Sequence, residues 1–386
     1  MGKDFMQPYT LYYATNRHHL GDDAHPTGYD SKFSDDGNEN LRFGYLTVQA
    51  DEQQVLNYIN ANIDGLGKGD GNRLADYFTS LAKGASIETY TEKLDKNVAD
   101  TKQPLENFGS TEFLKDLKCE MMNSSDVLVF IHGFNVKWES AVGSALALQE
   151  MANVQHPAGK NIIVVLFSWP SEGEAIPMYS YLDDRSRARN SGFAVGRGFL
   201  KLKDFFIRLE ESVKAQKEEA CGQAIHLLCH SMGNYVLQNA VERMASFTQT
   251  PALPRLFENI FMCAADVDDT ALEPDQPLGR LNELARSINV YYNRDDKAMV
   301  FSETTKGNPE RLGYNGCARP YHVHSKVFQI DCTTVVPGSL FSVEHSYYTL
   351  GDINRDIVQT IAGIPQDSQQ RKREVSTELP NTWKMK

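Results

Sequence analysis

The stretch Ala224–Met244, AIHLLCHSMGNYVLQNAVERM, changes character at His230 and Ser231. Up to Cys229 it is a short apolar run, which is typical of a buried strand. Beyond the serine, apolar side chains recur on one face of an expected helix: Leu237, Ala240, Val241 and Met244. Gly233 stands in the turn between the two elements, where a tight bend needs small residues. The sequence therefore predicts a strand, a sharp turn that carries Ser231, and a helix.

The chain from Thr111 onward repeats this alternation of elements. Apolar runs of strand length end in polar residues in DVLVFIHGF, NIIVVLFSWP, NIFMCAADVDD, SINVYYNRDD and KVFQIDCT. Strands without polar alternation, separated by helices, predict an α/β fold with a mostly parallel central sheet and helices on both faces. Functional side chains in such a sheet gather at the carboxyl ends of the strands, and Ser231 lies at one of these ends.

The remaining parts of the chain have weaker patterns. YTLYYATNR and LRFGYLTVQ predict two strands near the N-terminus. We expect a single domain over residues 1–365, in which 51–109 is a weakly patterned insertion and its GLGKGDGN segment a solvent loop. Residues 366–386 are charged and lack apolar periodicity, so we expect a mobile C-terminal tail.

Charge, apolar run lengths and cysteine spacing argue against several classes of protein, although a local basic patch is not excluded. A formal net charge of −12 gives no general attraction to nucleic acid or to an anionic membrane. No apolar run is long enough to span a membrane, and the N-terminus lacks the apolar core of a secretory signal. The six cysteines form no C-x-x-C pair, which indicates free thiols in a reducing cytoplasm. Nothing in the composition indicates an oligomeric state.

Several segments together resemble a known superfamily. VLVFIHGFN, LFSWPS, LLCHSMGN, YYNRDDKAM and EHSYY, in this order, resemble the α/β hydrolases, and more narrowly a largely uncharacterised bacterial family of predicted esterase/lipase-like serine hydrolases. The resemblance runs from Tyr12 to Asp356, apart from the weakly patterned residues 51–109. The chain departs from the G-x-S-x-G pattern at Cys229, which stands where the first glycine is usual. Since this side chain is small and lies in an apolar run, we expect it to be a buried residue without a chemical role.

The resemblance implies a catalytic triad in the order serine, acid, histidine. Ser231 is the expected nucleophile and His345, in the loop after KVFQIDCT, the expected general base. Asp296 best matches the family's acid, and Asp266, after the preceding strand, is the alternative. The H-x-H pair in YHVHSK lacks a third ligand at motif spacing, so we expect no metal and no other cofactor.

An oxyanion hole needs two backbone N–H donors. One is expected from Met232, directly after the nucleophile. The resemblance assigns the other to Phe134, with Asn135 next in line, and gives His132 a structural role in positioning this loop. Residues 170–195 fall where α/β hydrolases insert a cap. Around this segment, three aromatic residues are candidates either for a substrate pocket or for packing on the edge of the sheet: Trp169, Tyr179 and Tyr181.

The sequence thus predicts a serine hydrolase that cleaves a small-molecule carboxylic ester or thioester through an acyl-enzyme. An acyltransferase or an amidase would use the same residues, and an α/β-hydrolase fold without catalysis would serve as a binding module. The sequence does not indicate the physiological substrate or the length of its acyl chain.

Overall fold

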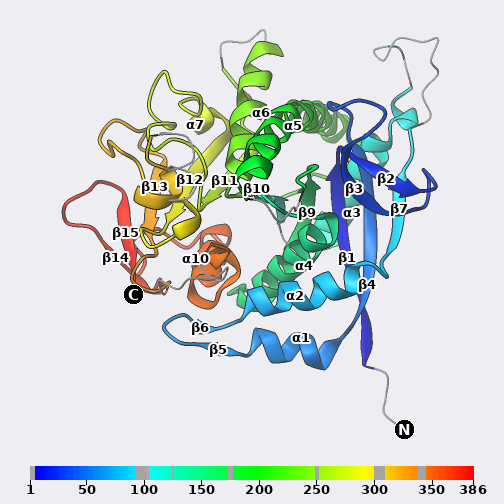
Figure 1. The fold of residues 1–386 in the computed structure, drawn as a ribbon. Coiled ribbons are helices and arrows are strands. Elements are labelled where there is room, and N and C mark those ends of the chain that lie inside the picture. The colour runs from blue at the N-terminus through cyan, green and yellow to red at the C-terminus, as the bar shows by residue number, and fades with distance from the viewer. Residues whose placement is uncertain are drawn as a thin grey trace.

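A computed structural model describes residues 5–92, 102, 104–123, 126–172, 177–247, 252–299, 309–336 and 345–386 (Figure 1). Within these ranges, eleven strands form one central sheet. In chain order they are β1 (Met6–Thr15), β4 (Arg42–Asp51), β7 (Ser86–Tyr90), β8 (Val127–Ile131), β9 (Ile163–Ser168), β10 (Ile225–His230), β11 (Phe257–Cys263), β12 (Ala285–Tyr292), β13 (Val327–Asp331), β14 (Arg373–Val375) and β15 (Thr382–Met385).

The sheet is mostly parallel, as predicted. Its order across the fold is β14-β15-β13-β12-β11-β10-β8-β9-β1-β4-β7. The strands from β15 to β1 pair in parallel, whereas the β14–β15, β1–β4 and β4–β7 pairs are antiparallel. Two small ribbons lie apart from it, β2 (Arg17–Gly21) with β3 (Pro26–Phe33), and β5 (Asn62–Ile63) with β6 (Gly67–Lys68).

Helices cover both faces of the sheet (Figure 1). One face packs against α1 (Glu52–Ile59), α2 (Gly71–Ala82), α4 (Trp138–Gln155) and α10 (Gly351–Ile361). The other face packs against α3 (Gly109–Asn123), α5 (Pro177–Lys214) and α6 (Gly233–Phe247). The short helices are η2 (Leu105–Asn107), α7 (Leu281–Leu284), α9 (Leu312–Asn315) and η4 (Tyr347–Thr349). This double cover explains why β10 is buried at every position and shows no polar alternation.

The described residues of the region 51–109 contribute side chains to the hydrophobic core. Helix α2 crosses α4 so closely that a Cβ on Gly143 would collide with the side chain of Thr79. The prediction of a solvent loop at GLGKGDGN is wrong, because Leu66 is fully buried and this turn forms hydrogen bonds with the start of α10. Its carbonyls at Leu66 and Gly69 accept hydrogen bonds from Asp352 N (2.8 Å) and Gly351 N (3.0 Å).

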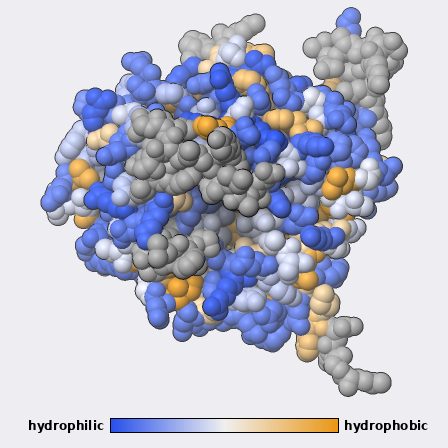
Figure 2. Space-filling model, in the orientation of Figure 1, coloured by the Kyte–Doolittle hydropathy of each residue, from blue (hydrophilic) through white to orange (hydrophobic). Residues whose placement is uncertain are grey.

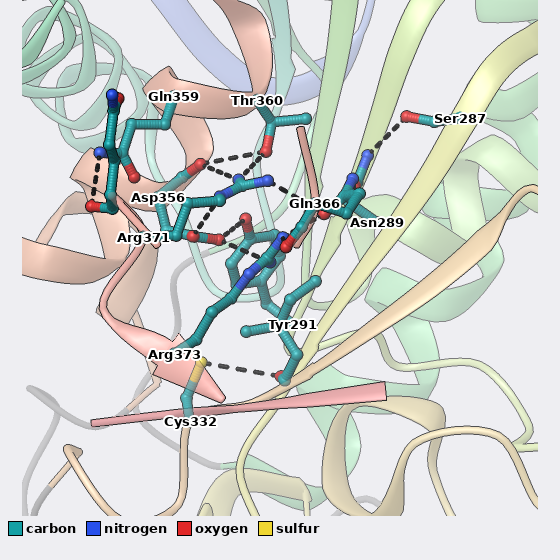
Figure 3. A network of polar contacts seen from close by, with 12 residues as sticks. Ser287, Asn289, Tyr291, Cys332, Asp356, Gln359, Thr360, Gln366, Arg371 and Arg373 are labelled. Atoms are coloured by element: carbon teal, nitrogen blue, oxygen red, sulfur yellow. Dashed lines mark hydrogen bonds and ion pairs between the residues drawn. The ribbon is translucent and has the colours of Figure 1, made fainter. Parts of the chain in front are cut away.

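The expected mobile tail over 366–386 also needs correction. Strands β14 and β15 extend the central sheet beyond β13. Arg371 and Arg373 are buried, and both pair with Asp356 on α10, at 2.8 Å from Arg371 Nε and 3.1 Å from Arg373 Nη1 (Figure 3). The hydroxyl of Tyr291 donates to the same carboxylate at 2.7 Å. Charged residues anchor this hairpin, so its sequence lacked the apolar periodicity of a packed element.

The surface seen in Figure 2 is mainly hydrophilic, with scattered apolar side chains. In the part of the chain that the structure describes, no helix combines the length and the apolar character needed to cross a membrane. The 38 residues of α5 have ample length but include many charged side chains.

The paired arginines give a test of the C-terminal hairpin. Arg371→Met should lower the free energy of unfolding by about 3 kcal/mol, because it leaves part of a buried carboxylate without its counter-charge. Urea denaturation followed by circular dichroism measures the loss. Lys386→Met is the matched control, since its ion pair with Glu374 is exposed and should contribute little. Equal stability of the Arg371 variant and the wild-type protein would contradict this account.

Candidate active site

The predicted strand–turn–helix around Ser231 is present. Strand β10 ends at His230 and α6 begins at Gly233. The backbone of Ser231 has φ of +52°, a left-handed conformation that is uncommon for a residue with a side chain. Hydrogen bonds fix it from both sides, since Ser231 N donates to Cys263 O (2.9 Å) and Ser231 O accepts from Asp266 N (3.1 Å). Such strained serines at the end of a central strand are characteristic of nucleophile elbows.

The space around the turn explains which neighbours must be small. A Cβ on Gly233 would lie 2.5 Å from Ile131 O and 2.7 Å from His132 O. A Cβ on Gly133 would lie 2.8 Å from the Cβ of Ser231, so this loop approaches the serine directly. Both glycines are therefore required by close contact between the elbow and the end of β8.

Cys229 needs no such freedom. It lies inside β10, where it pairs with Ile131 of β8 and Met262 of β11. Its side chain is fully buried, and this burial raises the pKa of the thiol well above its ordinary value. A buried, protonated thiol is a poor nucleophile, which agrees with the role expected for Cys229.

His345 and Asp296 form a close pair. The distance from His345 Nδ1 to Asp296 Oδ2 is 2.8 Å, and the carboxylate is 1% exposed. Asp296 Oδ1 accepts from Ala298 N at 3.0 Å, which orients the other oxygen toward the imidazole. Burial alone would lower the pKa of His345, but the charge and hydrogen bond of Asp296, with the charge of Asp266, outweigh it and raise that pKa above its ordinary value.

This pair lies next to the elbow. His230, the immediate neighbour of Ser231, has its Nε2 2.9 Å from the carbonyl oxygen of His345. The two imidazole rings are 4.7 Å apart between centroids. The structure thus brings the base candidate against the residue that precedes the nucleophile candidate.

Asp266, the alternative acid, has other partners. It is 1% exposed and accepts a hydrogen bond from the hydroxyl of Tyr181 at 2.7 Å. Arg311 Nε lies 3.3 Å from one of its oxygens and Arg185 Nη1 lies 4.0 Å from the other. The geometry therefore favours Asp296 as the partner of His345, with Asp266 contributing charge from a distance.

The loop after β8 is held by His132. Burial and the charge of Arg17 lower the pKa of His132 to about 3, so this imidazole is neutral. Its Nδ1–H donates to Gly133 O at 2.9 Å, because a carbonyl can only accept, and its Nε2 accepts from Trp169 N at 3.2 Å. His132 thus has the structural position that was expected of it.

Within this loop, the backbone N–H of Asn135 is already used. It donates to Asp184 Oδ2 at 3.2 Å, and Asp184 is fully buried although the sequence placed it in a charged, polar run. Among the described residues, the backbone N–H groups of Phe134 and Met232 have no hydrogen-bond partner. These two remain the better candidates for an oxyanion hole.

Arg17 is a residue that the sequence analysis missed. It is fully buried as the first residue of β2, just after the end of β1, and burial lowers its pKa to about 9. Its Nε donates to Ser168 Oγ at 2.9 Å and its Nη2 to Val136 O at 2.8 Å. Arg17 therefore connects the start of β2 to the end of β9 and to the loop after β8. Only its place at the end of the YYATNR strand hinted at this role.

The three aromatic residues considered for a substrate pocket differ in their surroundings. Trp169 is fully buried and stacks on His132, with ring centroids 5.3 Å apart. Its Nε1 donates to His132 O at 2.9 Å, so this residue packs against the loop after β8. Tyr181, on the first turns of α5, packs edge-on against Phe134 at 5.5 Å and is 3% exposed. The side chain of Tyr179 lies outside the described residues.

The expected cap segment 170–195 is, from residue 177, the first half of α5, which packs along α6. In the described ranges, no group of three or more side chains is placed to bind a metal ion.

Comparison with known proteins assigns the chain to a family. Residues 107–358 match the family described as an alpha/beta hydrolase of unknown function (DUF900). The chain belongs to this family. It is an α/β hydrolase, as the sequence motifs predicted, and the match leaves β1 to β7 and the C-terminal hairpin outside.

Other comparisons add little. No curated protein sequence matches the chain. Among solved structures, an esterase of Pyrobaculum calidifontis in a monoclinic crystal form is 10% identical, with 69% of this chain and 94% of that chain covered and a TM-score of 0.28. A likeness this low carries no argument about function.

The His345–Asp296 pair predicts a titration. In NMR spectra of the imidazole nitrogens, His345 should titrate above pH 6.5. Asp296→Asn should move the midpoint below this value, because burial then dominates, and Asp266→Asn should lower it by a smaller amount. Asp295→Asn, at an exposed neighbouring position, should leave it in place. An unchanged midpoint in Asp296→Asn would show that the pair does not form in solution.

Proposed function

We propose that this chain is a serine hydrolase that cleaves a carboxylic ester or thioester through an acyl-enzyme. The observation that carries the proposal is the 2.8 Å pair between His345 Nδ1 and Asp296, formed beside a strained serine at the end of a central strand. An aspartate on Nδ1 keeps the proton on that nitrogen and leaves the lone pair of Nε2 for a nucleophile. Ser231 is the nucleophile that this arrangement serves.

The proposed reaction has two halves. Ser231 Oγ attacks the acyl carbon while His345 takes the hydroxyl proton, and Asp296 stabilises the imidazolium that results. The tetrahedral intermediate collapses when His345 gives the proton to the leaving alcohol or thiol. A water molecule, deprotonated by the same imidazole, then attacks the acyl-serine. The imidazolium returns the proton to Ser231 Oγ as the acid is released. No metal or organic cofactor is needed for these steps.

The oxyanion that forms in each half-reaction needs fixed donors. We assign them to the backbone N–H groups of Met232, directly before α6, and of Phe134, after β8. Met232 gains from the positive end of the helix dipole, and Phe134 from a loop that His132 holds in one orientation. Donors fixed before the reaction stabilise the developing charge without reorganisation.

The setting we propose is a reducing cytoplasm. All six cysteines are free, and four of them are buried: Cys229, Cys263, Cys317 and Cys332. Buried unpaired thiols are common in proteins of reducing compartments.

Ser231 is expected to be the residue labelled by a fluorophosphonate probe. Ser231→Ala should abolish the labelling and lower turnover of p-nitrophenyl butyrate by about 10³-fold or more, since loss of a triad member removes the nucleophile. Mass spectrometry of the labelled peptide identifies the site. Cys229→Ala is the matched control, which should keep labelling near the wild-type level because Cys229 has a packing role only. Labelling that persists in Ser231→Ala would remove the central assignment.

The two acid candidates can be separated by turnover. Asp296→Asn should lower kcat for p-nitrophenyl butyrate by about 10³- to 10⁴-fold, because the amide cannot stabilise the imidazolium and favours the wrong tautomer. Asp266→Asn should cause a smaller loss, through the pKa of His345, and Asp295→Asn almost none. Circular dichroism checks that each variant folds. A crippled Asp266→Asn beside an active Asp296→Asn would reverse the assignment.

A further inference from the structure

The imidazole of His230 lies between the segment that carries His345 and the loop after β8. On one side its Nε2 lies 2.9 Å from His345 O. On the other side a Cβ on Gly133 would lie only 3.2 Å from His230 Nδ1, so the ring contacts the loop that leads to Phe134. The ring also packs on Tyr348, with centroids 4.9 Å apart. One side chain therefore contacts both the segment that carries the base and the loop that carries an oxyanion donor.

The direction of the hydrogen bond is fixed by chemistry. A carbonyl oxygen only accepts, so His230 Nε2 carries the proton and donates to His345. Burial, with the charge of a protonated His345 nearby, lowers the pKa of His230 well below its ordinary value. A neutral imidazole in this position keeps a single tautomer, whose N–H always points at the same carbonyl.

This bond complements the one that Asp296 makes. Asp296 holds the imidazole ring of His345 at Nδ1, whereas His230 holds the backbone of the same residue. Two contacts, one on the ring and one on the main chain, fix both the position and the rotation of the base. The second contact comes from the residue adjacent to Ser231, so the same peptide that places the nucleophile also fixes its distance from the base.

We propose that His230 is a positioning residue that holds His345 against Ser231 through the Nε2–H to carbonyl hydrogen bond. The proposal rests on the proposed function, in which His345 is the base. It assigns the histidine before the serine a role that the sequence pattern alone did not indicate. A displaced base reduces the rate of proton transfer without changing the binding of the substrate.

The test compares three variants with the wild-type protein. His230→Phe keeps the ring volume and removes the donor, and it should lower kcat for p-nitrophenyl butyrate by about 100-fold with KM almost unchanged. His230→Gln places an amide N–H near the position of Nε2 and should recover most of the loss. His226→Phe is the matched control, because His226 is a buried histidine at the other end of β10, bonded to Asp126 and Asn259.

A second readout does not depend on turnover. The Nδ1–H proton of His345, bonded to Asp296, should give a downfield resonance in the ¹H NMR spectrum. This resonance should shift or broaden in His230→Phe, return in His230→Gln and persist in His226→Phe. Circular dichroism and urea denaturation separate these effects from a general loss of stability.

Each outcome decides the proposal. Wild-type kcat and an unchanged resonance in His230→Phe would overturn it, and so would an equal loss of kcat in His226→Phe. Failure of the proposed function looks different, since Ser231→Ala would then keep its activity while the His345 resonance still responded to His230→Phe.

Discussion

The left-handed backbone of Ser231 is the constraint on which the rest of the site depends. A residue with a side chain pays a steric cost for this conformation, and the surrounding structure must hold it in place. Strand β11 supplies an acceptor at Cys263, and the turn after β11 supplies a donor at Asp266. The same bend brings Gly133 close to Ser231, and Gly233 close to the carbonyls of Ile131 and His132. The elbow is thus formed by three neighbouring strands, which explains why it requires the parallel order of the central sheet.

Buried polar side chains, more than apolar ones, hold the loops around this elbow. Arg17, His132 and Asp184 are all buried and donate or accept hydrogen bonds with the main chain of residues 133–172. Hydrogen bonds of this kind are directional, so they fix an irregular loop in one conformation, whereas apolar contacts alone tolerate several. The apolar residues of the two cores instead position the strands from which the loops extend.

The sequence predicted the parts of the molecule that depend on local pattern. The apolar strands and the helix after Ser231 follow from runs of residues. The assignment of Ser231, Asp296 and His345 came from the resemblance to the α/β hydrolases, and their roles in catalysis remain a proposal. The roles of Arg17 and Asp184 could not be predicted, because their partners are distant in the sequence. Arg17 donates to Val136 O, and Asp184 accepts from Asn135 N. Charged side chains are mostly exposed, so neither residue was expected to be buried. The C-terminal hairpin was missed for the same reason: its anchors are arginines.

The contact between Asp356 and the C-terminal arginines has a consequence for the order of folding during synthesis. Asp356 leaves the ribosome before Arg371 and Arg373, and until they follow, docking of α10 would bury a carboxylate without its counter-charges. Helix α10 begins soon after His345, at Gly351. We therefore expect the nascent chain to form the turn at Ser231 while the segment around His345, the proposed base, is not yet stably packed. We thus expect the proposed active site to be fully assembled only after the C-terminal hairpin has been translated.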